Sequence, residues 1–324
     1  MRTQTELQKL FQDYLMKQKF ENHPAELYDP MNYMISIGGK RMRAQLVLMS
    51  CEIFDCDATK SLSQAMAIEL FHNFTLIHDD IMDNAPLRRG HKTVHEKYNH
   101  NAAILSGDNM LIYAYQYLLK NSGEKIHSYL VHFNDTAIRV CEGQQLDMNF
   151  EKQAIVSVEE YLQMIEMKTA VLVGCALKIG AIAAGANELD SGLIFQVGKE
   201  LGIAFQLQDD ILDSFGDQKL TGKQAGGDII QNKKTLLLIE ALTLADSNQK
   251  EELESWLKKK EFSPEEKVKA VLRLYNELGI RKIAEAEMLK HYQSAMSYLR
   301  KLEIKEENKL VLKNFAETLL IREY

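Results

Sequence analysis

Two aspartate clusters of the same design, far apart in the chain, most constrain how this protein can fold. The first spans Asp79–Asp83 (DDIMD) and the second Asp209–Asp213 (DDILD). On an α-helix, the first and last aspartates of such a cluster share one face, about one turn apart. Both clusters follow apolar stretches, where unpaired carboxylates would repel one another and lose hydration. The pattern therefore predicts two helices whose acidic faces share metal ions, rather than two solvated helix surfaces.

The helical faces on which these aspartates lie indicate what else surrounds the metal ions. Carboxylate oxygens suit Mg²⁺, which completes its shell with water and the phosphates of a ligand. At about 100° per residue, His72 shares the face of Asp79 and Asp83. On the second helix, Gly202 and Gln206 continue the acidic face, and Gly202 has no side chain to fill the space. We expect a deep cavity with metal ions at its mouth and an apolar floor, which suits a diphosphate with a hydrocarbon tail.

Composition favours helix nearly throughout. The 324 residues include only four prolines and 17 glycines, and 46% are hydrophobic, which is ample for a core. No stretch of alternating β-branched residues predicts a strand, and no linker is long enough to divide the chain. We expect one all-α domain over residues 1–324, a helical bundle around a deep central cavity.

Breaks in the apolar periodicity set the expected elements. Pro24 and Pro30 predict a turn, Pro86 ends the helix that carries the first cluster, and Leu87–Gly90 is expected as a loop. The polar, glycine-rich segment at residues 217–228 is expected to be a lid. The periodicity predicts helices at residues 1–25, 31–37, 43–54, 58–83, 93–98, 101–120, 125–148, 158–185, 190–215, 235–245, 249–259, 264–278, 280–301 and 306–321.

Charge and cysteine content exclude several classes of protein. The net charge is −7, and no basic stripe interleaves with aromatic residues, so nucleic acid is not an expected partner. The four cysteines have no zinc spacing and indicate reduced thiols in the cytoplasm. The N-terminal residues show no apolar signal segment. The apolar stretch Ala170–Ala186 contains Lys178 and is short for a membrane span, so we expect a buried helix and no integral membrane segment.

Local groups of basic residues complement the acidic clusters. Lys40–Arg43 follow two glycines at a helix start, Arg88 and Arg89 follow the first cluster, and Lys233 and Lys234 follow the second. Each group alone is typical of a solvated turn or of simple charge balance. Together with two metal clusters, they are expected to neutralise diphosphate groups.

At this level of detail the chain resembles the trans-isoprenyl diphosphate synthases, the polyprenyl synthetase family. The motifs that carry the resemblance occur in the family's order. One departure is Ala44, where the family often has proline, and this should alter loop stiffness more than chemistry. The matching segments are Gly38–Arg43, His78–Asp83 with Leu87–Gly90, Gly143–Asp147, Lys168–Thr169, Phe205–Asp213, Gly222–Lys223 and Lys233–Thr235.

The resemblance implies the isoprenoid synthase fold and a role for each motif residue in joining isopentenyl diphosphate to an allylic diphosphate. Three Mg²⁺ ions would bind the allylic diphosphate, two through Asp79 and Asp83 and one through Asp209, with Asp213 acting through water. The cations expected on that diphosphate are Arg88, Lys168, Lys223 and Lys233. The residues expected on isopentenyl diphosphate are Lys40, Arg43, His72 and Arg89. Lys168, Thr169 and Gln206 are expected beside the reacting carbons.

The resemblance also bears on product length and assembly. In the family, a bulky residue five positions before the first aspartate stops the growing chain, and here that residue is Phe74. Phe71 lies about 12 Å below Asp79 at ~1.5 Å per residue. An ideal helical wheel points Phe74 away from the metal-binding face, so both rings can also be ordinary core. We expect a short-chain product of fifteen to twenty carbons, of the farnesyl or geranylgeranyl type, and a homodimer.

Three alternatives remain open from the sequence. A class I terpene cyclase also ionises a prenyl diphosphate at a DDxxD motif, but its second metal motif usually mixes Asn, Ser or Thr with Glu. A subunit of a longer-chain synthase without activity of its own should have lost some ligands, and none is missing here. A simple metal-binding helical protein would explain neither the basic loops nor their order.

Overall fold

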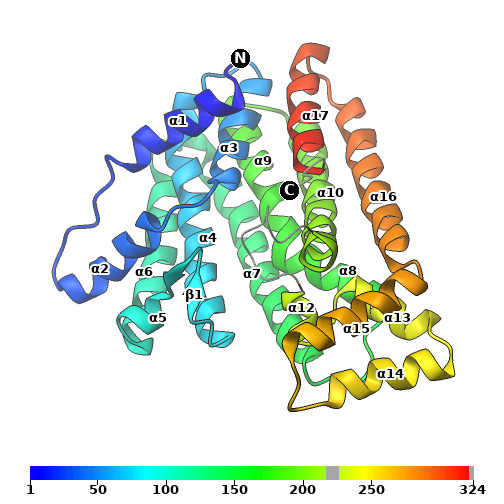
Figure 1. Ribbon diagram of the computed structural model, residues 1–324. Coiled ribbons are helices and arrows are strands. Elements are labelled where there is room, and N and C mark those ends of the chain that lie inside the picture. The colour runs from blue at the N-terminus through cyan, green and yellow to red at the C-terminus, as the bar shows by residue number, and fades with distance from the viewer. Residues whose placement is uncertain (217–225, 321–324) are drawn as a thin grey trace. The chain divides into compact units, whose positions relative to one another are not determined.

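The computed structural model describes residues 1–216 and 226–320, and within these ranges nearly every element is a helix (Figure 1). This confirms the expected all-α class. The described strands are β1 (Leu87–Arg88) and β2 (His91–Lys92), an antiparallel pair in which Leu87 faces Lys92 and Arg88 faces His91. The expectation of a plain loop at Leu87–Gly90 is therefore wrong. A turn of two left-handed residues brings the strand ends together there.

The chain divides into two compact units. The first comprises Met1–Asn134, Cys175–Phe195 and Glu303–Lys309, and the second comprises Asp135–Gly174, Gln196–Leu302 and the chain from Leu310 onward. Helices α7 (Ile126–Phe150), α9 (Val171–Ala184), α10 (Glu188–Phe215) and α17 (Glu306–Leu320) contribute residues to both units, and the chain also passes from one unit to the other at Leu302–Glu303, in the connection before α17. The expectation of a single domain stays a prediction.

The first unit is built on two packed helices, α4 (Leu62–Met82) and α6 (His100–Leu119). Helix α3 packs against α4 and buries every residue from Ala44 to Ile53. The other elements that begin in this unit are α1 (Gln4–Leu15), α2 (Ala25–Ser36), α3 (Met42–Ile53), η1 (Ala58–Ser61), α5 (Val94–Lys97), η2 (Gly123–Lys125), α7 (Ile126–Phe150), α10 (Glu188–Phe215) and α17 (Glu306–Leu320).

Two helix boundaries near the N-terminus differ from the sequence predictions. The first helix ends at Leu15 rather than near residue 25, because the apolar spacing that docks Leu7, Phe11 and Leu15 is not continued in the next turn. Helix α2 begins at Ala25 and includes Pro30, where the sequence predicts a turn. Packing of α2 against α6 buries Pro30 and outweighs the hydrogen bond that proline cannot make.

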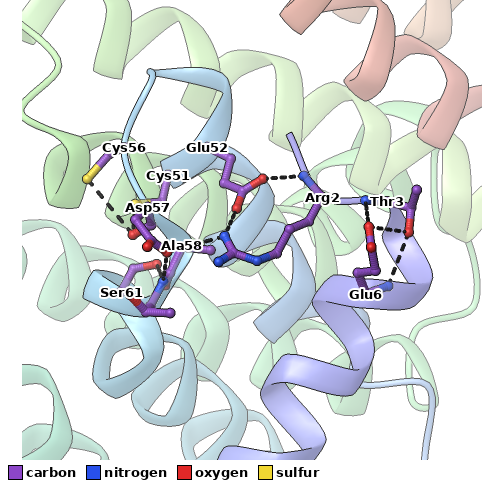
Figure 2. A network of polar contacts seen from close by, with 10 residues as sticks. Arg2, Thr3, Glu6, Cys51, Glu52, Cys56, Asp57, Ala58 and Ser61 are labelled. Carbon is purple, nitrogen blue, oxygen red and sulfur yellow. Dashed lines mark hydrogen bonds and ion pairs between the residues drawn. The ribbon is translucent and has the colours of Figure 1, made fainter.

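Polar contacts tie the N-terminal residues to the end of α3, as Figure 2 shows. The Arg2 guanidinium pairs with the Glu52 carboxylate, and its backbone N–H donates to the same carboxylate at 2.7 Å. Thr3 and Glu6 form a capping box at the start of α1. Helix α3 ends in a Schellman motif, since the N–H of Cys56 donates to the carbonyl of Cys51 at 3.2 Å.

The second unit packs its helices around an apolar cluster that includes Phe150, Leu207, Ile211 and Leu274. Its long apolar helix contains a π-helical turn, η3 (Glu166–Ala170), between α8 and α9. The elements of this unit are α8 (Val158–Ile165), η3, α12 (Gly227–Ile230), α13 (Leu236–Leu244), α14 (Ser247–Lys258), α15 (Pro264–Glu277) and α16 (Ile280–Lys301), with the first turn of α9 (Val171–Ala184) and the later parts of α7, α10 and α17.

One described segment, Val158–Ala184, is long and apolar enough to cross a membrane. Its most apolar stretch is 78% buried inside the protein, as expected of a core helix. This agrees with the sequence interpretation of the stretch, while the expected cytoplasmic location stays a prediction.

Candidate functional site

The first aspartate cluster lies at the C-terminal end of α4, and its members differ in exposure. Asp83 is exposed at the C-cap and Asp79 is half-buried, whereas Asp80 is only 2% exposed. Asp80 accepts hydrogen bonds from the Nε of Arg88 at 2.8 and 3.0 Å, and Arg88 Nη2 lies 2.8 Å from the same carboxylate. The middle aspartate is therefore held by an internal ion pair, and the outer carboxylates can meet a ligand.

The β1–β2 hairpin positions Arg88 and Arg89. Its turn residues, Arg89 and Gly90, have φ angles of 54° and 77°, as in a type I′ turn. Arg88 thereby reaches back to Asp80, while Arg89 donates to the carbonyl of Gly38. The sequence assigned Arg88 to a diphosphate; in this structure the side chain already has a carboxylate partner, and the assignment stays a prediction.

The Gly38–Gly39 loop admits the Arg89 guanidinium because it has no side chains. A Cβ on Gly39, whose φ is 132°, would lie 2.7 Å from the Cζ of Arg89. Any larger residue at position 39 would displace the guanidinium and strain the backbone. The two glycines therefore let one arginine lie directly on the loop that precedes Lys40.

The basic residues after this loop separate into two roles. Arg41 is buried and pairs with the buried Glu69 at 2.7 Å, so it fixes the start of α3. This corrects the expectation that Lys40, Arg41 and Arg43 together form a cationic loop for an anion. Arg43, by contrast, extends to His72, with 3.1 Å between its Nη1 and the His72 Nε2.

The surroundings of His72 are strongly basic. Burial and the neighbouring guanidinium groups of Arg43, Arg89 and Arg88 hold the pKa of His72 well below its ordinary value. The imidazole is therefore neutral near pH 7 and accepts or donates a hydrogen bond without adding charge. Lys40, which directly follows the Gly38–Gly39 loop, is exposed. The first unit thus brings together Arg43, His72 and Arg89, three of the four residues that the sequence assigned to isopentenyl diphosphate.

The second aspartate cluster, near the end of α10, repeats the division seen in the first. Asp210 is 5% exposed, whereas Asp209 is exposed and Asp213 half-buried. Asp210 accepts hydrogen bonds from the hydroxyl of buried Tyr161 and, at 3.0 Å, from the Nε2 of Gln206. Burial and the charge of Asp228 raise the pKa of Asp210 to about 8.

Asp213 is attached to the segment that follows the undescribed residues. Its Oδ2 accepts from the N–H of Asp228 at 2.9 Å, and its carbonyl accepts from Gly226 at 2.7 Å. Lys233 lies 3.4 Å from Asp228 through its Nζ. Lys223, assigned to the allylic diphosphate, falls outside the described residues, as does most of the loop predicted as a lid at residues 217–228.

The π-helical turn presents Lys168 and Thr169. Gly143 of α7 permits this, because a Cβ at that position would lie 2.7 Å from the Cα of Lys168. Lys168 Nζ pairs with Asp147 at 2.5 Å, and Thr169 Oγ1 donates to the Oε1 of Gln206 at 3.4 Å. The second unit thereby links Thr169, Gln206 and Asp210 in one chain of hydrogen bonds. π-Helical turns are frequent at functional sites.

Gly202 does not open a cavity, which corrects the sequence interpretation. A Cβ there would lie 2.6 Å from the Cα of Ala170, so the backbone of the π-helical turn already occupies the space. Glycine at this position lets α10 pack closely against that turn. The close packing sets the separation between Thr169 and Gln206, which lie on these two elements.

Phe71 and Phe74 belong to a run of packed rings in the first unit. The ring centroid of Phe74 is 5.6 Å from that of Phe71 and 4.8 Å from that of His78, and Phe71 is 5.2 Å from Phe133 of α7. Phe71 is 1% and Phe74 9% exposed. The rings thus form a packed, buried aromatic layer on the part of α4 that precedes the first cluster, and their role in product length stays a prediction.

Asp79 and Asp83 belong to the first unit, and Asp209 and Asp213 to the second. Within the described ranges, no three His, Cys, Asp or Glu residues gather as a metal-ligand group. The joint magnesium site expected from all four aspartates therefore stays a prediction.

Comparison with known proteins identifies the family. The sequence matches the polyprenyl synthetase family over residues 24–275. The chain belongs to this family. It is 36% identical over 303 residues to a short chain isoprenyl diphosphate synthase of Methanothermobacter thermautotrophicus, covering 93% of this chain and 92% of the relative. It is 38% identical over 236 residues to a geranylfarnesyl diphosphate synthase of Natronomonas pharaonis, covering 67% and 69%. A solved geranylgeranyl pyrophosphate synthase has 42% identity and a TM-score of 0.95, with both chains covered in full.

Membership in the polyprenyl synthetase family confirms the resemblance drawn from the motifs. Sequence reasoning nevertheless missed three residues that the structure connects to them, Asp147, Tyr161 and Asp228. Asp147 closes one of the matching motifs and could have been noticed as a carboxylate partner for a lysine. Nothing in the sequence near Tyr161 or Asp228 indicates that either contacts an aspartate cluster.

Proposed function

We propose that this polyprenyl synthetase is a trans-prenyltransferase that condenses isopentenyl diphosphate with an allylic prenyl diphosphate. The observation that carries the proposal is the division shared by both aspartate clusters. In each, the middle aspartate is buried and has a side-chain partner, Arg88 or Tyr161, whereas the outer two are half-buried or exposed. Outer carboxylates on two such clusters suit Mg²⁺ and a diphosphate.

The residues present fit magnesium as the cofactor. Asp79, Asp83, Asp209 and Asp213 supply the hard carboxylate oxygens that Mg²⁺ prefers, and three ions would be shared with the allylic diphosphate. When bound, the ions would stabilise the charge that develops on the departing diphosphate. Lys168, Lys223, Lys233 and Arg88 would neutralise the charge that remains.

The chain's own residues would then guide the reaction. Loss of diphosphate from the allylic substrate leaves a delocalised carbocation, and the double bond of isopentenyl diphosphate attacks it to form the new carbon–carbon bond. The oxygens of Thr169 and Gln206 would stabilise the positive charge. The hydrogen bond between these two side chains supports the assignment, because it brings their oxygens side by side. A proton is finally lost to the departed diphosphate, since no His or Glu is convincingly positioned as a base.

The basic group of the first unit would bind isopentenyl diphosphate without metal. Arg43 and Arg89 supply charge, and neutral His72 supplies a hydrogen bond beside them. Lys40 directly follows the Gly38–Gly39 loop and would bind the same diphosphate. Arginine suits this task because its guanidinium binds phosphate oxygens in pairs.

A product of fifteen to twenty carbons is the length that we propose. The aromatic layer of Phe74 and Phe71 is packed and buried, as a floor for the growing chain would need to be. The relatives named as short chain isoprenyl and geranylgeranyl synthases support this range, whereas the two named as geranylfarnesyl synthases make a product one isoprene unit beyond it.

We also propose a homodimer assembled through α6. This helix exposes Ile104, Leu105, Ile112 and Leu119, and at about 100° per residue they fall within one sector of its surface. Ile112 is 65% exposed. Four exposed large apolar side chains in one sector, with exposed Asp108 among them, are costly in water and typical of a surface that another chain covers.

Purified protein incubated with labelled isopentenyl diphosphate and each allylic primer tests the proposal. We expect chain elongation that requires Mg²⁺ and stops at fifteen or twenty carbons, measured by sizing the dephosphorylated products. Cyclic products from a single prenyl diphosphate, with no incorporation of isopentenyl diphosphate, would instead identify a terpene cyclase.

A further inference from the structure

A lysine of the second unit, Lys267 of α15, is buried without a carboxylate partner. The residue is 0% exposed, and none of the ion pairs in the described part of the chain includes it. The Nζ donates to the carbonyl of Ile230 at 3.1 Å and to the Oδ1 of Asn232 at 2.5 Å. Burial of a charged amine lowers its pKa and costs stability, and the two hydrogen bonds and the Phe262 ring, whose centroid lies 4.3 Å from the Nζ, offset this cost.

Both acceptors lie in the short segment between Gly226 and Lys233, which carries the contacts of the second cluster. Asn232 has a left-handed φ of 58°, and its amide also donates to the carbonyl of Leu257 at 3.1 Å. Lys267 therefore holds Asn232 by a hydrogen bond. The left-handed backbone of Asn232 sets the direction of the chain immediately before Lys233. The backbone N–H of Lys233 then donates to the carbonyl of Asp228 at 2.9 Å.

The neighbouring residue of α15 holds the other end of the same segment. Gly226 has a φ of 79°, and a Cβ there would lie 2.7 Å from the Cγ2 of Val268. At this end Gly226 and Asp228 bond to Asp213. One turn of α15 thus contacts both the start and the end of the segment.

We infer that Lys267 is a positioning residue, which holds the segment from Gly226 to Lys233 so that Asp228 stays on Asp213 and Lys233 is aimed at the allylic diphosphate. The inference rests on the proposed function for the identity of that ligand. Lys267 acts through Lys233 and Asp213 and itself touches no substrate.

Lys267→Met tests the inference, because methionine keeps the length of the side chain and removes its charge and its donors. Lys269→Met, an exposed lysine on the same helix, is the matched control. In the substrate-free protein we expect hydrogen exchange of the amides of Gln231, Asn232 and Lys233 to quicken about tenfold in Lys267→Met and to stay unchanged in the control. Thermal stability should change little, since removal of a buried cation offsets the loss of its two hydrogen bonds.

Kinetics provide the second measurement. The KM for the allylic diphosphate should rise about tenfold in Lys267→Met, and the KM for isopentenyl diphosphate should not change. A merely structural role would lower thermal stability and affect both substrates alike, which would overturn the inference. Unchanged exchange at residues 231–233 would overturn it as well.

Asn232→Gly keeps the test decisive if Lys267→Met fails to fold. Glycine tolerates the left-handed backbone at this position and removes the acceptor that Lys267 uses. The same faster exchange and the same rise in KM are expected. Because exchange is measured without substrate, it reports on the segment even if wild-type protein makes no prenyl product, an outcome that would contradict the proposed function alone.

Discussion

The hydroxyl of Tyr161 donates a hydrogen bond to the buried carboxylate of Asp210, much as the guanidinium of Arg88 pairs with Asp80 in the first cluster. The buried middle aspartate thus has a hydrogen-bond donor in both clusters, a cation in the first and a neutral hydroxyl in the second. Without a cation beside it, Asp210 has a pKa raised by burial. The middle and outer aspartates should therefore respond differently to substitution.

Substitution of the outer aspartates should abolish turnover and spare the fold. We expect Asp79→Ala or Asp209→Ala to lower kcat by a factor of at least about a thousand, because each removes a ligand for Mg²⁺. Circular dichroism should match wild type, and thermal stability of the metal-free protein should be equal or higher, since crowded carboxylates are relieved. Wild-type turnover that persists in EDTA would contradict the assignment.

The middle aspartate of the first cluster should instead matter for stability. Asp80→Ala leaves the Arg88 guanidinium, 25% exposed, without its carboxylate. We expect a loss of about 1–3 kcal/mol in the free energy of unfolding, measured in urea, against little change for Asp79→Ala. Equal stability of the two variants would show that the Asp80–Arg88 pair contributes nothing to the fold.

The two diphosphate sites should separate kinetically. Arg43→Ala or Lys40→Ala should raise the KM for isopentenyl diphosphate by the equivalent of about 1.5–3 kcal/mol, and should change the KM for the allylic substrate far less. Lys233→Ala should show the opposite bias, and Lys223→Ala is expected to do the same. Similar effects of all these variants on both substrates would argue against two sites.

The apolar surface of α6 should mediate assembly. Light scattering at micromolar concentration should give a dimer for wild type and a monomer for Ile112→Asp, because a buried carboxylate at the interface would be strongly unfavourable. Leu189→Asp, with a leucine of similar exposure on α10, is the control and should remain dimeric. A monomeric wild type would rule out the proposed homodimer.

Product length should depend on the aromatic layer. Phe74→Ala or Phe71→Ala removes a ring from the packed run and should shift products beyond twenty carbons. Each substitution should also cost about 3 kcal/mol of stability, because a core ring is lost. If neither variant, nor the two combined, lengthens the product, the floor of the cavity lies elsewhere.

The sequence by itself determined the all-α class, the positions of most helices and the family. Helical periodicity, proline breaks and capping residues such as Ser157 with Glu160 act within a few residues, so they can be seen along the chain. The chemistry-bearing motifs are equally local, since each places its carboxylates or cations on a single helix or turn.

Only the tertiary structure decided how those residues are paired. It assigned Arg41 to Glu69 and Tyr161 to Asp210, and it filled the space beside Gly202 with the backbone of Ala170. Such partners come from distant parts of the chain, and their choice depends on which surfaces pack together. A glycine that permits close packing and a glycine that leaves a cavity look the same in the sequence, because the difference lies in the neighbouring backbone.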